Sequence, residues 1–418
     1  MIQTVALDNG VTLLCEPVPG VETCSVGFWY PTGSRDESAA ERGQSHFLEH
    51  MLFKGTARRT ARDIAVEVDR VGGALNAFTE KESTCYYCSL PAEHLGLAVD
   101  VIADMVSSAT LSEAEIAKEK LVVINEIEAS EDSPDEKGYQ LYVESMWPKH
   151  ELAGKIAGET DEVRSIERDA LQVFYYSRCA PPNLTVSVAG PVDIPALVTS
   201  LSSLPAASNG AHVAERSAPT HHVERRFVPD RYHQAQLYLG ASMAPTTDIR
   251  DYLAFVVLST AFGESMSSRL FQRIREDEGL CYAVGSFRTH YSDTWSWTIC
   301  ATAVPDVLDR LLTALNRELV ELMADPLSEE EVRDAVSHIT GSMVFAKEDM
   351  ETRMRRMVGQ REMFGRVTEI DEAADLLRTI EAADVAAVAT RLIRPGAVSL
   401  FSYGTRNVRA LRDVPLDF

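Results

Sequence analysis

Apolar and polar residues along the chain repeat with two periods, which predict strands at the start of each half and long helices after them. Residues 5–16 and 235–239 have the composition of strands, and the first stretch contains the hairpin turn signal Asp8-Asn9-Gly10. Residues 98–107 and 307–323 carry apolar positions three and four apart, the pattern of an amphipathic helix. Strands also close each half, so we expect an α+β fold with largely antiparallel sheets.

This order of elements occurs twice, which predicts a duplicated domain. Three landmarks recur, namely a capped acidic helix start, a second helix start and a strand that ends in glycine: residues 111–116 and 327–332, 165–170 and 379–384, and 186–190 and 400–404. The offsets between the copies are 216 (327 − 111), 214 (379 − 165) and 214 (400 − 186). Nearly equal offsets over three landmarks indicate two homologous domains.

The stretch between the two copies is small, polar and non-periodic, as is typical of a linker. We therefore predict an N-terminal domain over residues 1–207, a linker over residues 208–221 and a homologous C-terminal domain over residues 222–418. Each domain is long enough to bury its own hydrophobic core.

Composition and charge narrow the choice of partners. The chain has 45% hydrophobic and 25% charged residues, values typical of a globular protein, and no apolar run approaches the ~20 residues of a membrane span. A formal net charge of −23 argues against nucleic acid as a partner, because phosphate binding needs a basic surface. An acidic interior would favour basic peptides, and an acidic surface that serves only solubility is an equally good interpretation.

The seven cysteines are scattered and odd in number, which favours a reducing compartment over a disulfide framework. Cys85 and Cys88 have the spacing of half a zinc or redox motif. They lie in a predicted strand, where residues three apart face opposite sides, so we interpret them as structural. The chain does not open with the basic and apolar regions of a secretory signal. We expect a bacterial cytoplasmic protein, or an organellar matrix protein whose transit peptide has been removed.

The run His46-Phe47-Leu48-Glu49-His50 is the strongest chemical signal in the chain. On a helix, two histidines four apart project from one face and can bind one metal ion together. Glu49 lies near the same face, where it can take a proton from a metal-bound water. The apolar residues around the motif predict a helix buried on several sides, and buried histidines need partners that a metal supplies. The H-x-x-E-H order indicates peptide hydrolysis.

A catalytic zinc site needs a third protein ligand. The segment over residues 119–127 offers Glu119 and Glu126, which are seven apart and share a helix face after two turns. Spacing alone does not choose among Glu126, Glu119 and Glu128.

With these residues the chain resembles the pitrilysin-type inverzincins, and most closely short processing peptidases such as the β subunit of the mitochondrial processing peptidase. Other matching stretches are residues 33–37, 53–56 and 72–79, and the likeness extends over both halves. Gln44 departs from the apolar residue that is usual in the family. The family's third ligand lies 76 residues after the second histidine, which implies Glu126 (126 − 50), with Glu119 as an accessory glutamate one seven-residue step earlier.

The resemblance also assigns residues that their patterns alone do not mark. Residues 76–79, with Asn76, Ala77 and Phe78, resemble the family's edge strand, which binds an extended substrate backbone by β-addition. Without the resemblance this segment is an ordinary strand. Arg275 and Tyr282 match an element that holds a substrate carbonyl and stabilises the oxyanion. Taken alone, they would be a surface arginine and a half-buried packing tyrosine.

The resemblance implies a zinc-dependent endopeptidase with one Zn²⁺ per chain, bound by His46, His50 and Glu126, and with Glu49 as general base. Long members of the family enclose a chamber with four such domains, so two domains would form half of a clamshell. Since this chain carries both the zinc motif and the Arg…Tyr element, we expect a homodimer that acts on extended oligopeptides or presequence-like segments. The alternatives are a non-catalytic scaffold subunit and a peptide-binding subunit of a larger complex.

Overall fold

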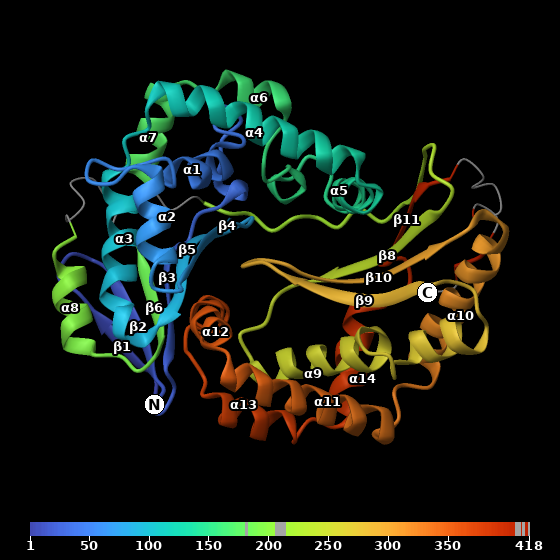
Figure 1. The fold of residues 1–418 in the computed structure, drawn as a ribbon. Coiled ribbons are helices and arrows are strands. Elements are labelled where there is room, and N and C mark those ends of the chain that lie inside the picture. Colours follow the sequence, from blue (N-terminus) through green and yellow to red (C-terminus); the bar gives the residue numbers. More distant parts are fainter. Residues whose placement is uncertain (180–182, 205–214, 406–410, 412–413, 417–418) are drawn as a thin grey trace. The chain divides into compact units, whose positions relative to one another are not determined.

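The computed structural model of the chain describes residues 1–179, 183–204, 215–405, 411 and 414–416 (Figure 1). The chain divides into two compact units, and each of them is assembled from three separate segments. Unit 1 consists of Met1–Ala129, Gly154–Arg216 and Phe345–Glu369. Unit 2 consists of Ser130–Ala153, Ser217–Val344 and Ile370–Phe418. Residues 208–214 of the predicted linker lie outside the described residues.

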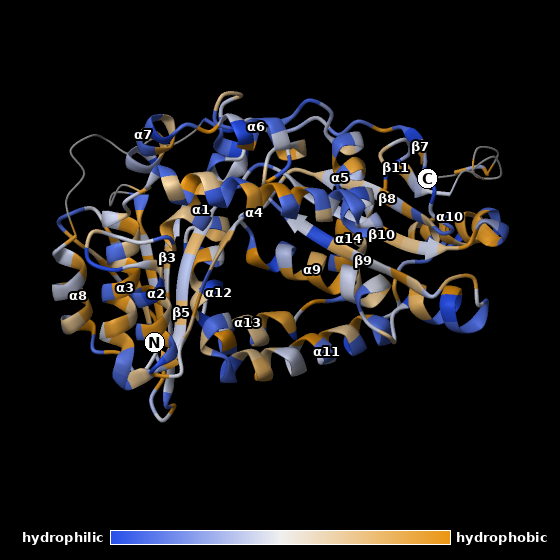
Figure 2. Cartoon of the chain, turned by 45° about the horizontal axis from the view of Figure 1, so that its top comes forward, coloured by the Kyte–Doolittle hydropathy of each residue, from blue (hydrophilic) through white to orange (hydrophobic). Residues whose placement is uncertain are grey.

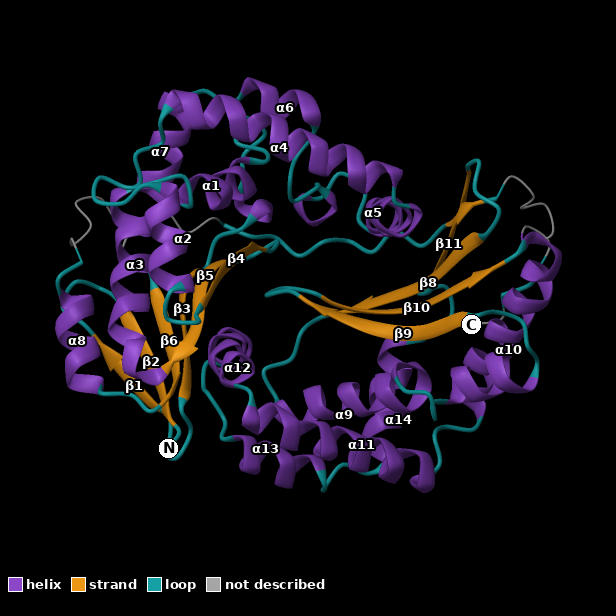
Figure 3. Ribbon diagram, in the orientation of Figure 1, coloured by secondary structure: helices purple, strands orange, loops and turns teal. Residues whose placement is uncertain are grey.

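Unit 1 contains a six-stranded sheet with the order β1-β2-β6-β3-β5-β4 (Figure 3). Its strands are β1 (Gln3–Ala6), β2 (Thr12–Pro17), β3 (Thr23–Tyr30), β4 (Ala74–Thr79), β5 (Thr84–Pro91) and β6 (Thr185–Gly190). All neighbours are antiparallel except β2 and β6, which are parallel. β1 and β2 form the hairpin that the Asp8-Asn9-Gly10 turn predicted.

The helices of unit 1 that precede Ser130, where the chain passes into unit 2, cover one face of this sheet. They are α1 (Gln44–Leu52), α2 (Ala61–Asp69), α3 (Leu95–Ser108) and most of α4 (Glu113–Asp132). After the chain returns to unit 1 at Gly154, the helices α6 (Thr160–Ser165), α7 (Arg168–Arg178) and α8 (Ile194–Ser202) follow. The predicted helix over residues 98–107 is the interior of α3, which is largely hydrophobic (Figure 2). Its buried side chains join those of β3 and β5 in the main core of the unit.

Unit 2 contains a five-stranded sheet with the order β7-β11-β8-β10-β9. Its strands are β7 (Arg225–Pro229), β8 (Ala235–Met243), β9 (Ala283–His290), β10 (Trp295–Ala303) and β11 (Ser399–Gly404). Here too one pair is parallel, β7 with β11, and the other pairs are antiparallel. Apart from β1, the two sheets therefore have the same order and the same strand directions.

The helices of unit 2 are α5 (Pro134–Met146), α9 (Ile249–Ser259), α10 (Leu308–Ala324), most of α11 (Glu329–Glu348), α13 (Ile370–Leu377) and α14 (Ala382–Leu392). Two short π-helices, η5 (Thr260–Glu264) and η6 (Phe271–Asp277), follow α9. The helix starts recur at the offsets read from the sequence: α4 and α11 begin 216 residues apart (329 − 113), and α7 and α14 begin 214 apart (382 − 168). The prediction of two homologous α+β domains is confirmed, with the addition of one parallel pair in each sheet.

One pair of helices is exchanged between the two halves of the sequence. α12 (Met350–Phe364) comes from the second half but packs on β3 and β6 of unit 1. Its counterpart α5, which begins 216 residues earlier (350 − 134), packs on β8 and β11 of unit 2. α12 closes a small core that contains Leu14, Trp29 and Cys85, and α5 closes one that contains Tyr238 and Phe401. Each sheet therefore buries its second face under a helix from the other half.

Cys85 and Cys88 lie on opposite faces of β5, as the strand interpretation predicted. Cys85 faces the core under α12, and Cys88 faces the core with α3. Both thiols are free, and burial raises the pKa of each. They have the surroundings of packing residues.

Candidate metal centre

Helix α1 presents two faces of opposite character. Phe47, Leu48, Met51 and Leu52 are buried in the main core of unit 1. His46, Glu49 and His50 project from the other side and are only partly buried. The apolar residues of the motif therefore fix the helix against the sheet, and its polar residues remain available for chemistry.

Three side chains of unit 1 form a group that could hold a metal ion. One ligand atom from each of His46, His50 and Glu126 lies within 4.8 Å of the other two, and no other such group of three occurs among the described residues. The two imidazole rings are 4.6 Å apart between centroids, and His50 Nε2 is 3.5 Å from Glu126 Oε2. Glu126 reaches the histidines from α4, with 48% of its side chain exposed. Of the three glutamates that spacing left open, Glu126 is the one in this group.

Glu119, two helical turns before Glu126, contacts the same histidine on its other nitrogen. Glu119 Oε1 lies 2.9 Å from His50 Nδ1, and its second oxygen lies 2.7 Å from the Lys54 ammonium. An ionised carboxylate can only accept, so His50 donates its Nδ1–H and keeps the lone pair of Nε2 for a metal. Glu119 thus orients the His50 ring without joining the group, and the Lys54 ammonium is paired with the Glu119 carboxylate.

The donor set passes a test of fit for zinc. His46 Nδ1 is buried without a hydrogen-bond partner among the described residues, and such an orphaned group is costly unless something binds the ring. Burial, together with the nearby His50, lowers the pKa of His46 to about 4, so the imidazole is neutral and ready to bind a cation near pH 7. Two neutral imidazoles and a carboxylate are a typical ligand set for catalytic zinc.

Glu49 lies between the metal group and the sheet. Its Oε2 accepts a hydrogen bond of 2.6 Å from the hydroxyl of Thr79, the last residue of β4. Burial raises the pKa of Glu49, and the Thr79 hydrogen bond opposes that rise. A carboxylate with a raised pKa next to a metal group is suited to accept a proton and release it again.

The strand that contains Asn76, Ala77 and Phe78 is at the edge of its sheet. β4 pairs only with β5 among the described strands, so its other side offers unpaired main-chain groups. The Ala77 N–H is bound to the side chain of Asn76 at 2.9 Å rather than to a neighbouring strand. Phe78 lies on the opposite face from Thr79, under the Arg355 guanidinium at 4.3 Å. An extended peptide could add to this edge.

Arg275 and Tyr282 lie together in unit 2. Arg275 is in the π-helix η6, and its guanidinium lies 4.9 Å from the centre of the Tyr282 ring and 4.4 Å from that of Phe271. The Tyr282 side chain is 81% exposed, so the interpretation of this residue as half-buried packing is wrong. An aromatic ring held outside the core by a cation is available to a ligand.

The sequence placed Thr79 in the edge strand but did not predict its contact with Glu49, and it gave no role to Lys54, although both residues lie in stretches that match the family. Strand periodicity could have placed Thr79 on the same face as Ala77. It could not show which helix that face meets. The Lys54 contact with Glu119 joins residues 65 apart (119 − 54), and no local pattern marks such a pair.

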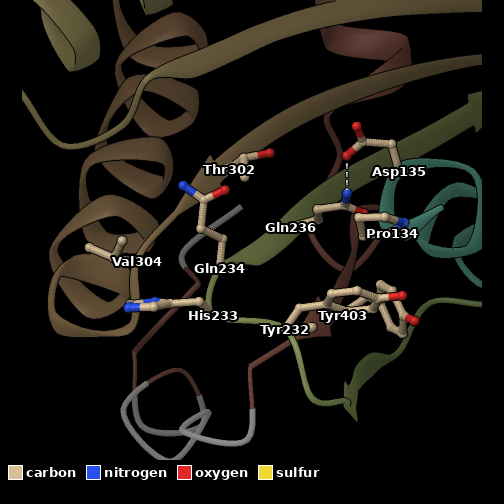
Figure 4. Close-up of a pocket in the computed structure, with 10 residues that line it drawn as sticks. Pro134, Asp135, Tyr232, His233, Gln234, Gln236, Thr302, Val304 and Tyr403 are labelled. Carbon is tan, nitrogen blue, oxygen red and sulfur yellow. Dashed lines mark hydrogen bonds between the residues drawn. The ribbon is translucent and has the colours of Figure 1, made fainter. Parts of the chain in front are cut away.

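Unit 2 also contains a hollow of about 470 Å³ at the ends of β8, β10 and β11 (Figure 4). Asp135 accepts a hydrogen bond from Gln236 there, and Tyr232 meets Tyr403 edge-on at 5.8 Å between ring centres. The lining includes neither Arg275 nor Tyr282. This hollow therefore contains none of the residues predicted from the sequence.

No helix within the described ranges is both long and apolar enough to span a membrane. This agrees with the absence of long apolar runs in the sequence.

Comparison with known proteins defines the class to which this fold and this site belong. A model described as insulinase, peptidase family M16, matches residues 13–160, and a model described as peptidase M16 inactive domain matches residues 165–338. The "uncharacterized zinc protease YmxG" of Bacillus subtilis is 34% identical over 94% of this chain and 96% of its own length. An "uncharacterized zinc protease" of Rickettsia bellii is 33% identical over 94% and 95%.

Solved structures show the same fold. The crystal structure of a protease from Helicobacter pylori has a TM-score of 0.89 and 20% identity over 97% of this chain and 99% of that one. That of a peptidase M16 inactive domain from Pseudomonas fluorescens has a TM-score of 0.88 and 17% identity over 97% and 98%. The chain belongs to the insulinase family of peptidases, M16. Zinc is its cofactor, and the His-His-Glu group suits it.

Proposed function

We propose that the chain is a zinc-dependent endopeptidase that hydrolyses extended oligopeptides or presequence-like segments. The observation that carries this proposal is the arrangement in unit 1: a group of three donors lies beside Glu49, and Glu49 is hydrogen-bonded to the last residue of an open edge strand. A hydrolytic centre and a site for an extended backbone are therefore joined by one hydrogen bond.

Bound zinc would supply a water of pKa ~7 and a Lewis acid for the scissile carbonyl. In the proposed reaction His46, His50 and Glu126 hold the ion, and Glu119 fixes the His50 ring. Glu49 takes a proton from the attacking water and passes it to the leaving amine. The raised pKa of Glu49 favours both steps, because the proton is accepted readily and held until the amine needs it.

The edge strand β4 would bind the substrate main chain. Addition of an extended peptide pairs its backbone with the open side of residues 76–78 and leaves selectivity to side-chain contacts. The Asn76 side chain, which now occupies the Ala77 N–H, would have to turn away when the peptide binds. An extended conformation is thus a condition for cleavage, and compact folded proteins should be poor substrates.

Arg275 and Tyr282 would hold the substrate carbonyl and stabilise the developing oxyanion, supplied in a homodimer by a second copy of the chain. The exposed ring with a guanidinium beside it supports this role. Mixing a His50→Ala chain with a Tyr282→Phe chain tests it. Recovery of activity in the mixture supports action across the dimer, and mixtures as inactive as the parents contradict it.

The substitution Glu49→Gln tests the proposed function itself. We expect peptide turnover to fall by about 10²–10⁴-fold or more, while the zinc content and the peptide affinity stay close to those of the wild type. Zinc is measured by elemental analysis, and peptide binding by fluorescence anisotropy. Unchanged turnover in this variant would refute the role of Glu49.

A non-catalytic scaffold or peptide-binding subunit is the second candidate, and the open edge strand is the observation that favours it. It predicts that the wild-type chain binds zinc and peptide but cleaves no member of a peptide library. For either function we propose a cytoplasmic setting, which the seven free cysteines support.

A further inference from the structure

The helix that carries the H-x-x-E-H motif is capped from outside. Its N-cap residue, Gly43, has no side chain with which to accept the first N–H groups. Both oxygens of Glu37 do so instead: Oε2 accepts the Gly43 N–H at 2.9 Å, and Oε1 accepts the Ser45 N–H at 2.6 Å. Glu37 thus has the role that a Ser, Thr or Asp N-cap usually has.

The shape of the chain at Gly43 explains this arrangement. Gly43 has a φ of +80°, a left-handed conformation that glycine adopts readily, and a β-carbon there would lie 2.8 Å from the carbonyl oxygen of Ala157. A capping side chain at position 43 would therefore meet both strain and a clash. The cap has to come from another segment.

The turn that carries Glu37 is firmly attached to the loop after the edge strand. Ser34 N–H donates to the carbonyl of Glu80 at 3.1 Å, and Arg35 N–H donates to that of Lys81 at 2.8 Å. These two carbonyls follow β4 directly. The same turn is therefore bound to the substrate edge at one end and to the start of α1 at the other.

Two arginines hold the turn in place through Asp36. Arg216 binds both carboxylate oxygens of Asp36 at 2.8 Å, and Arg178 donates to the Asp36 carbonyl at 3.0 Å. A bidentate arginine–carboxylate pair is among the most geometrically specific contacts in proteins. Since Asp36 is buried and precedes Glu37, the backbone from which Glu37 reaches α1 has little freedom.

We propose that Glu37 is a positioning residue that sets the start of α1, and with it the ligand His46, relative to the edge strand β4. His46 is the residue after Ser45, whose N–H is held by Glu37, so a shift of this turn moves the first metal ligand directly. The Thr79–Glu49 hydrogen bond then fixes the same helix one turn later. Glu37, which caps the helix, and Glu49, the proposed general base, thus both align the metal group with the strand.

The inference rests on the proposed zinc-peptidase function. The burial of the Glu37 carboxyl group supports it independently. Burial raises the pKa of Glu37 to about 7 against the hydrogen bonds from Ser45 and Gly43, so the fold retains this carboxyl group in surroundings that disfavour its charge.

The neighbouring helix α2 provides a matched control. Asp63 accepts hydrogen bonds from the Thr60 N–H at 2.9 Å and the Thr60 hydroxyl at 2.7 Å, and the Thr60 hydroxyl in turn accepts the Asp63 N–H. α2 carries no member of the metal group. Asp63→Asn therefore weakens a helix cap of the same kind without touching the motif.

The test compares Glu37→Gln with Asp63→Asn in the full chain. An amide has a single acceptor oxygen, so Glu37→Gln keeps the shape of the side chain and loses one hydrogen bond. We expect zinc affinity, measured by chelator competition, to fall about 10- to 100-fold in Glu37→Gln and to stay at the wild-type value in Asp63→Asn. Hydrogen exchange of the 43–46 amides should accelerate in the first variant only, and kcat should fall with KM nearly unchanged.

Equal zinc affinity in Glu37→Gln and wild type, at equal folded fraction by circular dichroism, overturns the proposal. If Glu37→Gln does not fold, Glu37→Asp decides, because its shorter side chain reaches only one N–H group. If neither folds, Glu37 determines folding rather than positioning, and the proposal fails. A wild-type chain that binds no zinc would instead refute the proposed function.

Discussion

The two units place corresponding helices at the same site on corresponding sheets and use them differently. In unit 1, α1 packs beside the edge strand β4 and against α7. In unit 2, α9 and η5 pack beside the edge strand β9, with α9 against α14. His46 and His50 of the candidate metal group are on the first of these helices. At the second, Ser259 accepts a hydrogen bond from the Trp297 indole at 3.1 Å and donates to Glu264 at 2.6 Å.

This difference shows that the framework and the chemistry of the duplicated domain are separable. Unit 2 keeps the strand order and the helix spacing, but no such group of three donors occurs among its described residues, and Ser259 at the end of α9 is hydrogen-bonded to Trp297 and Glu264. The three residues of the candidate group, His46, His50 and Glu126, lie on helices α1 and α4 and not in the strands of the sheet. Unit 2 instead contains Arg275 and Tyr282, for which we propose a role in substrate binding.

In a second respect the units are alike, since each lacks one helix of its own and takes the equivalent helix from the other half. The exchange means that the N-terminal half of the sequence does not contain a complete unit 1. A family with one active and one inactive domain could otherwise be expected to lose the inactive one. The exchanged helices make each half a structural requirement for the other.

The largest effect is expected when unit 1 is deprived of α12, the helix that it takes from the second half of the sequence. A fragment of residues 1–216 lacks α12, so the buried face formed by Leu14, Trp29, Cys85 and Ala189 would be exposed to water. We expect this fragment to lose cooperative thermal unfolding and zinc binding, as measured by near-ultraviolet circular dichroism and chelator competition. Adding residues 345–369 through a long flexible linker should restore both. A fragment that unfolds cooperatively without α12 would show that the exchange is dispensable.

The next largest effect is expected from substitutions at one pair of equivalent positions, one in each unit. Glu126 on α4 corresponds to Ser342 on α11 (342 − 126 = 216), and the Ser342 hydroxyl only donates to the carbonyl of His338, at 3.1 Å. We expect Glu126→Gln to lower zinc affinity by about 100-fold or more, because one of three ligands loses its charge. Ser342→Ala should leave it unchanged. Wild-type zinc affinity in Glu126→Gln would remove Glu126 from the ligand set.

The sequence was sufficient to predict the duplication and to single out the residues that the structure brings together in the candidate metal group. Helix caps such as Ser112, strands that end in glycine and the H-x-x-E-H run are local patterns, so they could be read directly and their spacing measured. The family resemblance selected Glu126 where spacing left three glutamates open. The geometry adds the reason: His50 has two ring nitrogens, and Glu119 and Glu126 each meet one of them.

What could not be predicted depends on contacts between distant segments. No local pattern shows that α12 leaves its own half, because its apolar face suits any sheet with room for it. The cap of α1 was also missed, since Gly43 has no capping side chain and Glu37 reaches the helix across a turn. The interpretation of Tyr282 from its pattern alone as half-buried packing was wrong, because an aromatic side chain is usually buried, and here its contact is a guanidinium.

A partly buried histidine in each unit, His46 and His290, allows a comparison by pH. Burial, more than the nearby Arg288, lowers the pKa of His290 to about 4, and its ring lies among Tyr252, Phe255 and Trp295. An unfolded histidine titrates near 6.5, so between pH 6.5 and 4 the unfolded state binds more protons and stability falls as pH falls. We expect zinc-free wild type to lose up to about 3 kcal/mol more than His290→Phe over this range.

Urea unfolding at pH 7.5 and pH 4.5 measures this difference. His46 of unit 1 has its pKa lowered to about the same value, and it remains in both proteins, so the comparison isolates the histidine that has no proposed metal to bind. Parallel stability curves for the two proteins would show that His290 is not kept neutral by its surroundings.

The smallest effect compares how the exchanged helices fit their sheets. A β-carbon at Gly27 of β3 would lie 2.5 Å from the Met354 sulfur of α12 and 2.7 Å from the Trp29 indole nitrogen, whereas one at Gly240 of β8 would collide at a shorter approach with the Tyr142 hydroxyl of α5. Methionine adapts easily and the Trp29 side chain would have to shift, but the Tyr142 ring is fully buried, and its hydroxyl is 2.8 Å from that of Thr298. We therefore expect both substitutions to destabilise, Gly240→Ala by about 1–3 kcal/mol and Gly27→Ala by less.

Adding Tyr142→Phe to Gly240→Ala tests the assigned cause, because removal of the hydroxyl relieves the collision and the two changes should be less than additive in a double-mutant cycle. Tyr142→Phe alone costs about 1 kcal/mol for the hydrogen bond to Thr298. Strict additivity, or a larger loss at Gly27 than at Gly240, would mean that the two helices do not meet their sheets in these different ways. The predicted inequality follows from the closer approach of the Tyr142 hydroxyl and from the flexibility of Met354, so the two interfaces of the exchanged helices differ in how well each tolerates an added carbon.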